Sequence, residues 1–192
     1  MKNASIGVEN MGTKVRNIRT TQTKQSLINA FVNMVNEKDF EKITVADLTK
    51  GAHVNRATFY AHFNDKYELL DYIVNESASA VIEKHTSGNM KFDKEYIHQL
   101  VLAVCDYHQP PNFQCRSSYF SLIPQLKDKM LLELKKKLSK SLDFIYADIE
   151  KSFYVPIYAN IILEAGYLWA SGQVTFDKEE VAKKASILIL GE

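Results

Sequence analysis

The apolar residues of this chain recur with the spacing of amphipathic helices. One apolar stripe, at positions i, i+1, i+4, i+7 and i+8 within residues 21–38, consists of Leu27, Ile28, Phe31, Met34 and Val35. Only 7 Gly and 4 Pro interrupt the 192 residues, and this scarcity of helix breakers favours long helices. We therefore predict an all-α protein.

Beyond residue 64 the pattern predicts six further helices, over residues 65–85, 93–108, 114–123, 124–152, 156–172 and 177–190. Pro124 and Pro156 each suit the first position of a helix, where the missing N–H costs nothing. Asp177 and Glu180 resemble a capping box at the start of the last helix. With three helices before residue 64, the total is about nine.

Two short helices separated by a tight turn are predicted near the N-terminus. Thr44 and Asp47 form a capping-box-like start for a helix over residues 45–50, and Asn55 is a good N-cap for a helix over residues 56–62. Residues 51–54 between them make a four-residue turn. Together with residues 21–38 they predict a helix-turn-helix domain over residues 20–66. Residues 1–19 are predicted to be a flexible arm, and residues 67–192 a second helical domain.

The helix over residues 56–62 has one apolar face and one small, polar-edged face. At about 100° per residue, Phe59 and Phe63 share the side that should anchor the module. The opposite face is expected to comprise Ala57 and Ala61, flanked by Thr58, Tyr60 and Arg56, with His62 nearer the core. Such a face fits the major groove of DNA, because small residues allow close approach. An ordinary solvated helix face is the alternative.

Charge and composition narrow the class of protein. Residues 1–66 carry ten Lys or Arg against six Asp or Glu, whereas the remainder carries 14 against 17. A basic front end suggests a polyanionic partner. No apolar run approaches the roughly 18 residues of a membrane span, and residues 1–14 lack the apolar core of a signal peptide, so we expect a cytoplasmic protein. Cys105 and Cys115 are then expected to be reduced thiols.

Two segments, TVADL at 44–48 and VNRATFYAHFNDKYELL at 54–70, closely resemble the signature of the TetR family of bacterial transcription regulators. The resemblance covers about residues 20–70. Asn55 stands where Ser is usual, and it caps a helix as well as Ser does. His53 stands where the turn usually has Gly, so a positive φ there would cost some strain and could alter the turn.

The resemblance implies a homodimer that binds an inverted repeat in double-stranded DNA, as a ligand-responsive repressor. The residues expected at the DNA are Thr44, Asn55, Arg56, Thr58, Tyr60, His62 and Lys66. Thr44 lies where helix N-terminal amides attract phosphate, and Lys66 begins the next helix as a point charge. A buried, hydrogen-bonded histidine is the alternative for His62.

In the same family the last two helices pair with their twofold mates as a four-helix bundle. Small and apolar residues of the corresponding segments are the expected dimer contacts here, namely Ile162, Gly166, Trp169, Ala170 and Ile187. The alternative is an intramolecular core. Aromatic residues between the predicted helices are the expected lining of a pocket for a small apolar or aromatic effector, namely Tyr96, Tyr107, Phe113, Tyr119, Phe120 and Tyr146. Core packing explains them equally well.

Enzyme and metal functions find little support in the sequence. It contains no GxxxxGK[ST], GxGxxG, GxSxG or HExxH motif, so we predict that it is not an enzyme and needs no cofactor. His98, Cys105 and His108 do not have the spacing of a metal site. The rival hypothesis is a coregulator of TetR shape that acts through a protein partner with little DNA affinity of its own, supported by His53 and the modest basic charge.

Overall fold

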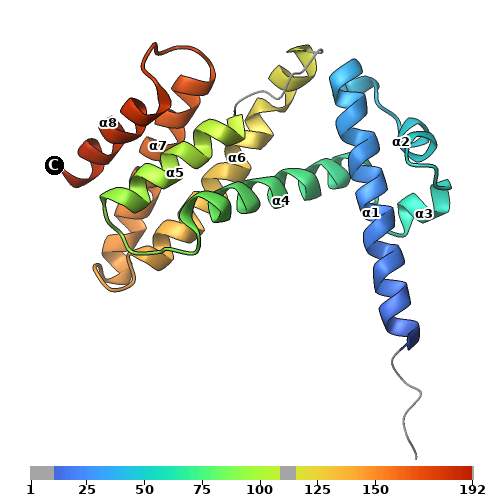
Figure 1. The fold of residues 1–192 in the computed structure, drawn as a ribbon, viewed down its shortest axis with the longest axis horizontal. Helices are drawn as coiled ribbons and strands as arrows, with labels where there is room; N and C mark the ends of the chain where they lie inside the picture. The colour runs from blue at the N-terminus through green and yellow to red at the C-terminus, as the bar shows by residue number, and fades with distance from the viewer. Residues whose placement is uncertain (1–10, 109–115, 192) are drawn as a thin grey trace, which may run out of the picture. The chain divides into compact units, whose positions relative to one another are not determined.

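The structure is a computed structural model that describes residues 11–108 and 116–191, with side chains over 21–108 and 121–191. These residues form eight α-helices and one short 3-10 helix, and no strand, which confirms the all-α prediction (Figure 1). In chain order the elements are α1 (Met11–Glu37), η1 (Phe40–Lys42), α2 (Val45–Gly51), α3 (Arg56–Tyr60), α4 (Lys66–Thr86), α5 (Lys94–His108), α6 (Arg116–Ser141), α7 (Asp148–Ala170) and α8 (Lys178–Leu190).

The described residues form one α-helix fewer than the predicted total of about nine because α6 continues through Pro124, whereas Pro156 only shifts a helix boundary. Pro124 is within α6, which joins two predicted helices and ends at Ser141. Pro156 is within α7, which begins at Asp148. A proline in a helix interior removes one backbone hydrogen bond and costs about 3 kcal/mol. Buried residues on both sides, such as Val155 and Ala159 around Pro156, offset that cost through packing.

The first helix also differs from the prediction. α1 begins at Met11, so residues 11–19 of the expected flexible arm are helical. No proline occurs in this segment, and Gly12 is its one strong helix breaker. The apolar stripe that indicated this helix in the sequence begins at Leu27, whereas the helix itself begins 16 residues earlier, at Met11.

The chain divides into two compact units, and the first comprises Met1–Leu69 with Gln114–Ser118. In this unit α2 packs against α1 and α3 (Figure 1). Its core is built from apolar side chains of α1, η1, α2 and α3, the largest buried ones being Leu27, Phe31, Phe40, Leu48 and Phe59. These contacts hold the two short helices, which are too short to be stable alone.

The second unit comprises Leu70–Phe113 and Tyr119–Glu192. Its central element is α5, on which every residue from Leu100 to Cys105 is buried. A helix that is apolar on all sides is covered on all sides. α7 and α8 pack on α5 and on each other. Within the described part of the chain, no helix is long and apolar enough to cross a membrane.

Candidate nucleic-acid interface

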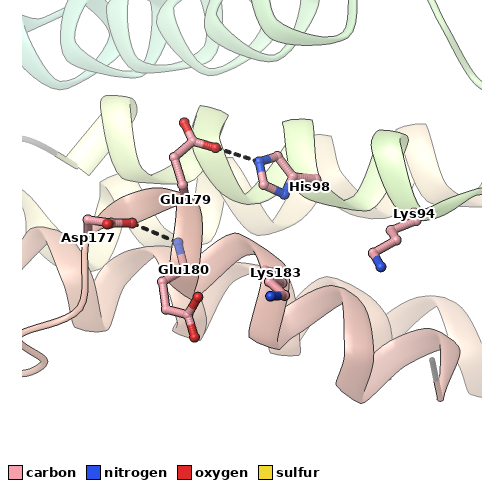
Figure 2. Close-up of a pocket in the computed structure, with 6 residues that line it drawn as sticks. All are labelled: Lys94, His98, Asp177, Glu179, Glu180 and Lys183. Atoms are coloured by element: carbon pink, nitrogen blue, oxygen red, sulfur yellow. Dashed lines mark hydrogen bonds and ion pairs between the residues drawn. The ribbon is translucent and has the colours of Figure 1, made fainter.

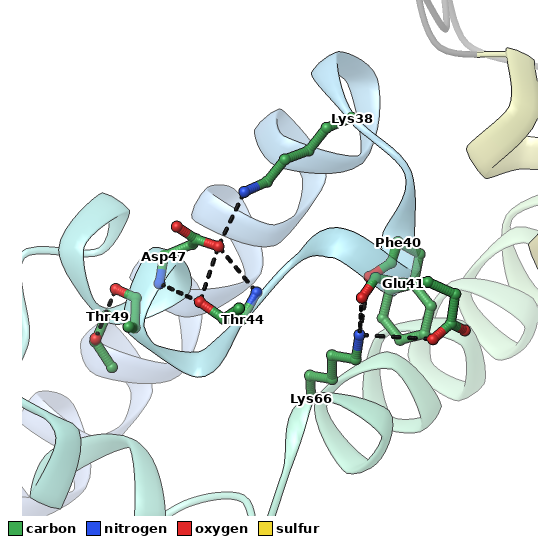
Figure 3. A network of polar contacts seen from close by, with 8 residues as sticks. Lys38, Phe40, Glu41, Thr44, Asp47, Thr49 and Lys66 are labelled. Carbon is green, nitrogen blue, oxygen red and sulfur yellow. Dashed lines mark hydrogen bonds and ion pairs between the residues drawn. The ribbon is translucent and has the colours of Figure 1, made fainter.

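The start of α2 is fixed by a complete capping box, as predicted. The Thr44 hydroxyl accepts from the Asp47 N–H at 3.1 Å, and the Thr44 N–H donates to the Asp47 carboxylate at 2.9 Å (Figure 3). Lys38 of α1 donates to the same carboxylate at 2.9 Å. The bond from Lys38 and those from Thr44 lower the pKa of Asp47 to about 2. α2 is therefore tied to α1 at its first turn.

The turn between α2 and α3 requires a left-handed residue, and that residue is His53, with φ of 55°. The turn closes with two backbone bonds, from the His53 N–H to the Lys50 carbonyl at 3.2 Å and from the Val54 N–H to the Thr49 carbonyl at 3.0 Å. The strain expected at His53 is therefore present, and the turn still closes.

Asn55 caps α3, as predicted. Its side-chain oxygen accepts from the Thr58 N–H at 2.8 Å and from the Thr58 hydroxyl at 3.0 Å. The cap satisfies a first-turn N–H that has no partner within the helix. α3 ends at Tyr60, two residues before the predicted end at residue 62.

The two faces of α3 are as the helical spacing predicted. Phe59 is completely buried and packs against Phe63, with ring centroids 5.9 Å apart. On the other side Arg56, Ala57 and Ala61 are exposed, and Tyr60 is 50% exposed. The guanidinium of Arg56 and the phenol oxygen of Tyr60 lie 3.5 Å apart. The outward face therefore presents two small residues beside a cation and a phenol.

His62 lies on the flank of α3, partly buried. Burial lowers its pKa below the usual value, and the charge of Lys24 on α1 lowers it further. The Lys24 ammonium also lies 5.8 Å from the centroid of the Phe63 ring. Lys24 was not singled out in the sequence, because its position beside α3 depends on how α1 packs.

Lys66 begins α4 but its ammonium points into its own unit. It donates to the Phe40 and Glu41 carbonyls, at 3.0 Å each, and its side chain is 13% exposed (Figure 3). Of the seven residues predicted at the DNA, Arg56 and Tyr60 lie together on the outward face. Thr44, Asn55 and Thr58 are engaged in helix caps.

Three of the aromatic residues predicted to line an effector pocket, Tyr96, Tyr107 and Tyr146, have described side chains. Tyr96 and Tyr107 are in the first and last turns of α5, about 16 Å apart along the axis at about 1.5 Å per residue. Tyr146 stacks on Tyr154 instead, with centroids 4.6 Å apart. Phe113 and the side chains of Tyr119 and Phe120 lie outside the described residues.

A hollow of about 380 Å³ lies between α5 and α8, with a charged lining of Lys94, His98, Asp177, Glu179, Glu180 and Lys183 (Figure 2). Its groups bond to one another: Glu179 contacts His98 at 2.7 Å, and Asp177 caps the Glu180 N–H at 2.8 Å. This lining is unlike the aromatic pocket expected from the sequence.

The residues predicted at a dimer interface have different surroundings within one chain. Ile162 is completely buried, and Gly166 packs against Val104 of α5. Trp169 and Ala170 are partly buried, and Ile187 is exposed. An exposed apolar stripe on α7, which was not predicted from the sequence, is formed by Ile149, Phe153 and Ile157. Their four-residue spacing was the available signal, and the helix boundaries predicted on either side of residue 153 concealed it.

Comparison with known proteins adds to this geometry. A family model described as "Bacterial regulatory proteins, tetR family" matches residues 27–73. The uncharacterized HTH-type transcriptional regulator YxbF of Bacillus subtilis (strain 168) is 36% identical over 69 residues, which are 35% of this chain and 18% of that protein. The HTH-type dhaKLM operon transcriptional activator DhaS of Lactococcus lactis subsp. lactis (strain IL1403) is 28% identical over 142 residues, 68% of this chain and 70% of that protein.

Solved structures share the fold over about nine tenths of the chain. A TetR transcriptional regulator from Streptococcus agalactiae 2603V superposes with a TM-score of 0.62 at 23% identity, covering 92% of this chain and 98% of that one. The dihydroxyacetone kinase operon activator DhaS superposes with a TM-score of 0.57 at 18% identity, covering 88% and 94%. The helix-turn-helix, the matched family model and the shared fold agree. Over residues 27–73 the chain matches the tetR family of bacterial regulatory proteins.

Proposed function

We propose that this regulator binds double-stranded DNA through the outward face of α3 and acts as a homodimer on an inverted repeat. The observation that carries the proposal is that one face of α3 is buried in the core of its unit while the opposite face is exposed. Phe59 is buried behind α3, while Ala57 and Ala61 leave room for bases between Arg56 and Tyr60. A helix with this profile suits the major groove.

The outward residues have distinct proposed roles. Arg56 is placed to donate to the acceptor edge of a guanine, and the Tyr60 phenol to donate to a phosphate. His62, beside Lys24, flanks the same face and adds a contact to the backbone of the duplex. The capping residues Thr44 and Asn55 lie at the helix starts that border this face, and with Thr58 they complete the proposed set.

The experiment that tests DNA binding is selection from a random duplex library by the full-length protein, followed by sequencing. A twofold dimer should enrich an inverted repeat with half-sites about one helical turn, or a multiple of it, apart. Enrichment of no site would favour the alternative, a coregulator that works through a protein partner. The closed turn around His53 supports DNA binding over that alternative.

The homodimer is proposed to use the exposed apolar residues of α7 and α8. Ile149 is 81% exposed and Phe153 62% exposed on α7, while Leu188 is 74% exposed on α8. Exposed apolar surface of this kind marks association sites in soluble proteins. Sedimentation equilibrium should give twice the chain mass at micromolar concentration, and a monomer would contradict the proposal.

Two candidate directions of regulation follow from different observations. Repression is the expectation from family resemblance, and a bound dimer would act by blocking the promoter. Activation is favoured by the relative aligned over 142 residues, which is described as an operon activator. A promoter reporter carrying the selected site, with and without the regulator, separates them by the sign of the change.

An apolar or aromatic effector is proposed to bind the second unit and to change DNA affinity. The supporting feature is an aromatic cluster at the end of α5, where the buried ring of His108 packs edge-on against Tyr107 and Tyr167 at 5.0 and 5.5 Å. By thermodynamic linkage, bound DNA must change the affinity for the effector by the same factor by which the effector changes the affinity for DNA. Thermal-shift screening and calorimetry with apolar compounds test this, and the absence of any binder would contradict it.

A further inference from the structure

Lys66 is the lysine that the family pattern places at the DNA, and its surroundings in this chain indicate another role. A lysine ammonium has three N–H donors. Two of them reach the carbonyl oxygens of Phe40 and Glu41, at 3.0 Å each, and the Glu41 carboxylate lies 3.8 Å away. Two of the three donors are thus engaged within the first unit, and an ion pair with Glu41 accompanies them.

The same ammonium sits over aromatic rings. It lies 4.5 Å from the centroid of the Phe40 ring and 5.2 Å from that of Tyr67. The charge is stabilised there by the ring faces and by the two carbonyl oxygens. One N–H remains for a phosphate, but the side chain is 13% exposed and the Glu41 carboxylate lies 3.8 Å from the ammonium, so this side chain is a poor phosphate donor.

A second set of contacts joins the same two segments. The Tyr67 phenol donates to the Glu41 carboxylate at 3.1 Å, and the rings of Phe40 and Tyr67 meet edge-on at 5.3 Å. η1 connects α1 to α2, and Thr44, the N-cap of α2, follows its last residue by two positions. Whatever holds η1 therefore holds the start of the helix-turn-helix.

We propose that Lys66 is a positioning residue that fixes η1, and with it the start of α2, to the first turn of α4, and that it makes no phosphate contact of its own. The proposal rests on the DNA-binding function proposed above. It predicts that loss of the ammonium lowers DNA affinity and leaves unchanged the number of counterions that binding releases from the DNA.

The test compares Lys66→Met, Lys66→Arg, Arg56→Ala and Lys136→Met in the full-length protein. Methionine keeps the apolar stem and loses the charge, arginine keeps a cation able to reach the carbonyls, and Lys136 is an exposed lysine of α6. Affinity for the selected DNA is measured by fluorescence anisotropy over a salt series. Hydrogen exchange follows the amides of Lys42 and Ile43, which donate to Asp39 and Phe40.

We expect Lys66→Met to weaken binding by roughly tenfold, the scale of one charged hydrogen bond, with an unchanged slope of log affinity against log salt. Its Lys42 and Ile43 amides should exchange faster than in the wild type. Lys66→Arg should restore both affinity and protection. Arg56→Ala should flatten the slope by about 0.9 if Arg56 contacts a phosphate, and by less if it contacts a base alone. Lys136→Met should change neither property.

A Lys66→Met slope that is flatter by about 0.9 would overturn the proposal, because it would make Lys66 a phosphate contact. Unchanged exchange at Lys42 and Ile43 would overturn it as well. Should the wild type bind no DNA, the proposed function fails, and the exchange measurement still decides whether Lys66 holds η1. If Lys66→Met does not fold, Tyr67→Phe, which loses the bond to Glu41, must show the same faster exchange and unchanged slope.

Discussion

Adding one methyl group at Gly166 should destabilise the contact between α7 and α5 inside a single chain. A Cβ at this position would lie 2.5 Å from Val104 Cγ1, 2.6 Å from Val104 Cβ and 3.1 Å from the Cys105 nitrogen. Non-bonded carbons prefer about 3.5–4.0 Å, so the two helices would have to separate by about 1 Å. Glycine is therefore required at this crossing.

The magnitude follows from two opposing effects. Overpacking of a close contact costs about 1–3 kcal/mol. Replacing a mid-helix glycine by alanine returns up to about 1 kcal/mol through helix propensity. We expect Gly166→Ala to lower the unfolding free energy by about 1–2 kcal/mol, and Gly166→Leu to lower it by more.

Urea unfolding followed by circular dichroism measures the loss, at protein concentrations about a hundredfold apart. A strained contact within the chain gives the same loss at both concentrations, whereas damage to a dimer interface makes the loss depend on concentration. Val104→Gly is the matched background, because it removes both carbons that the new Cβ would meet. A Gly166→Ala protein as stable as the wild type, or a loss that persists undiminished in the Val104→Gly background, would show that contact with Val104 does not require glycine here.

Three further predictions concern other parts of the chain. Burial lowers the pKa of His108 to about 4, whereas in the unfolded state the same ring takes up a proton below about pH 6.5. The unfolding free energy should therefore fall by up to about 3 kcal/mol as pH drops from 6.5 to 4. Urea titrations at several pH values measure this dependence on pH, and His108→Phe should remove it. Phe59→Ala should destabilise the first unit by about 3–5 kcal/mol by opening a cavity behind α3, seen as loss of helical signal, and an unaltered melting curve would contradict that burial. Phe153→Asp should shift the monomer–dimer equilibrium towards monomer in sedimentation while the urea midpoint of the monomer stays unchanged, and an unchanged dimer would remove Phe153 from the proposed interface.

The helix-turn-helix could be predicted from the sequence because its determinants are local. Thr44 and Asn55 each bond to a residue three positions later, and Phe59 and Phe63 share a face by helical spacing alone. The positive φ at His53 follows from the same short turn. Residues three or four positions apart are neighbours on any helix, so such contacts can be predicted once the helix itself is predicted.

The remaining features depend on packing between distant segments. α7 continues through Pro156 because Val155 and Ala159 are buried against other helices. Gly166 has the small size expected of an interface residue, and only the fold shows that its neighbour is Val104. Lys66 matches the family pattern, yet the two carbonyls that it reaches lie 26 and 25 residues earlier in the chain. Periodicity cannot supply such pairings.

DNA binding by the outward face of α3 can be measured by fluorescence anisotropy with the selected inverted repeat. The variant is Arg56→Ala/Tyr60→Ala, whose two side chains are exposed and whose loss should leave the fold intact. We predict wild-type circular dichroism with affinity lowered by at least about thirtyfold, the scale of two contacts worth about 1–3 kcal/mol each. A folded double variant that binds this DNA as tightly as the wild type would contradict the account.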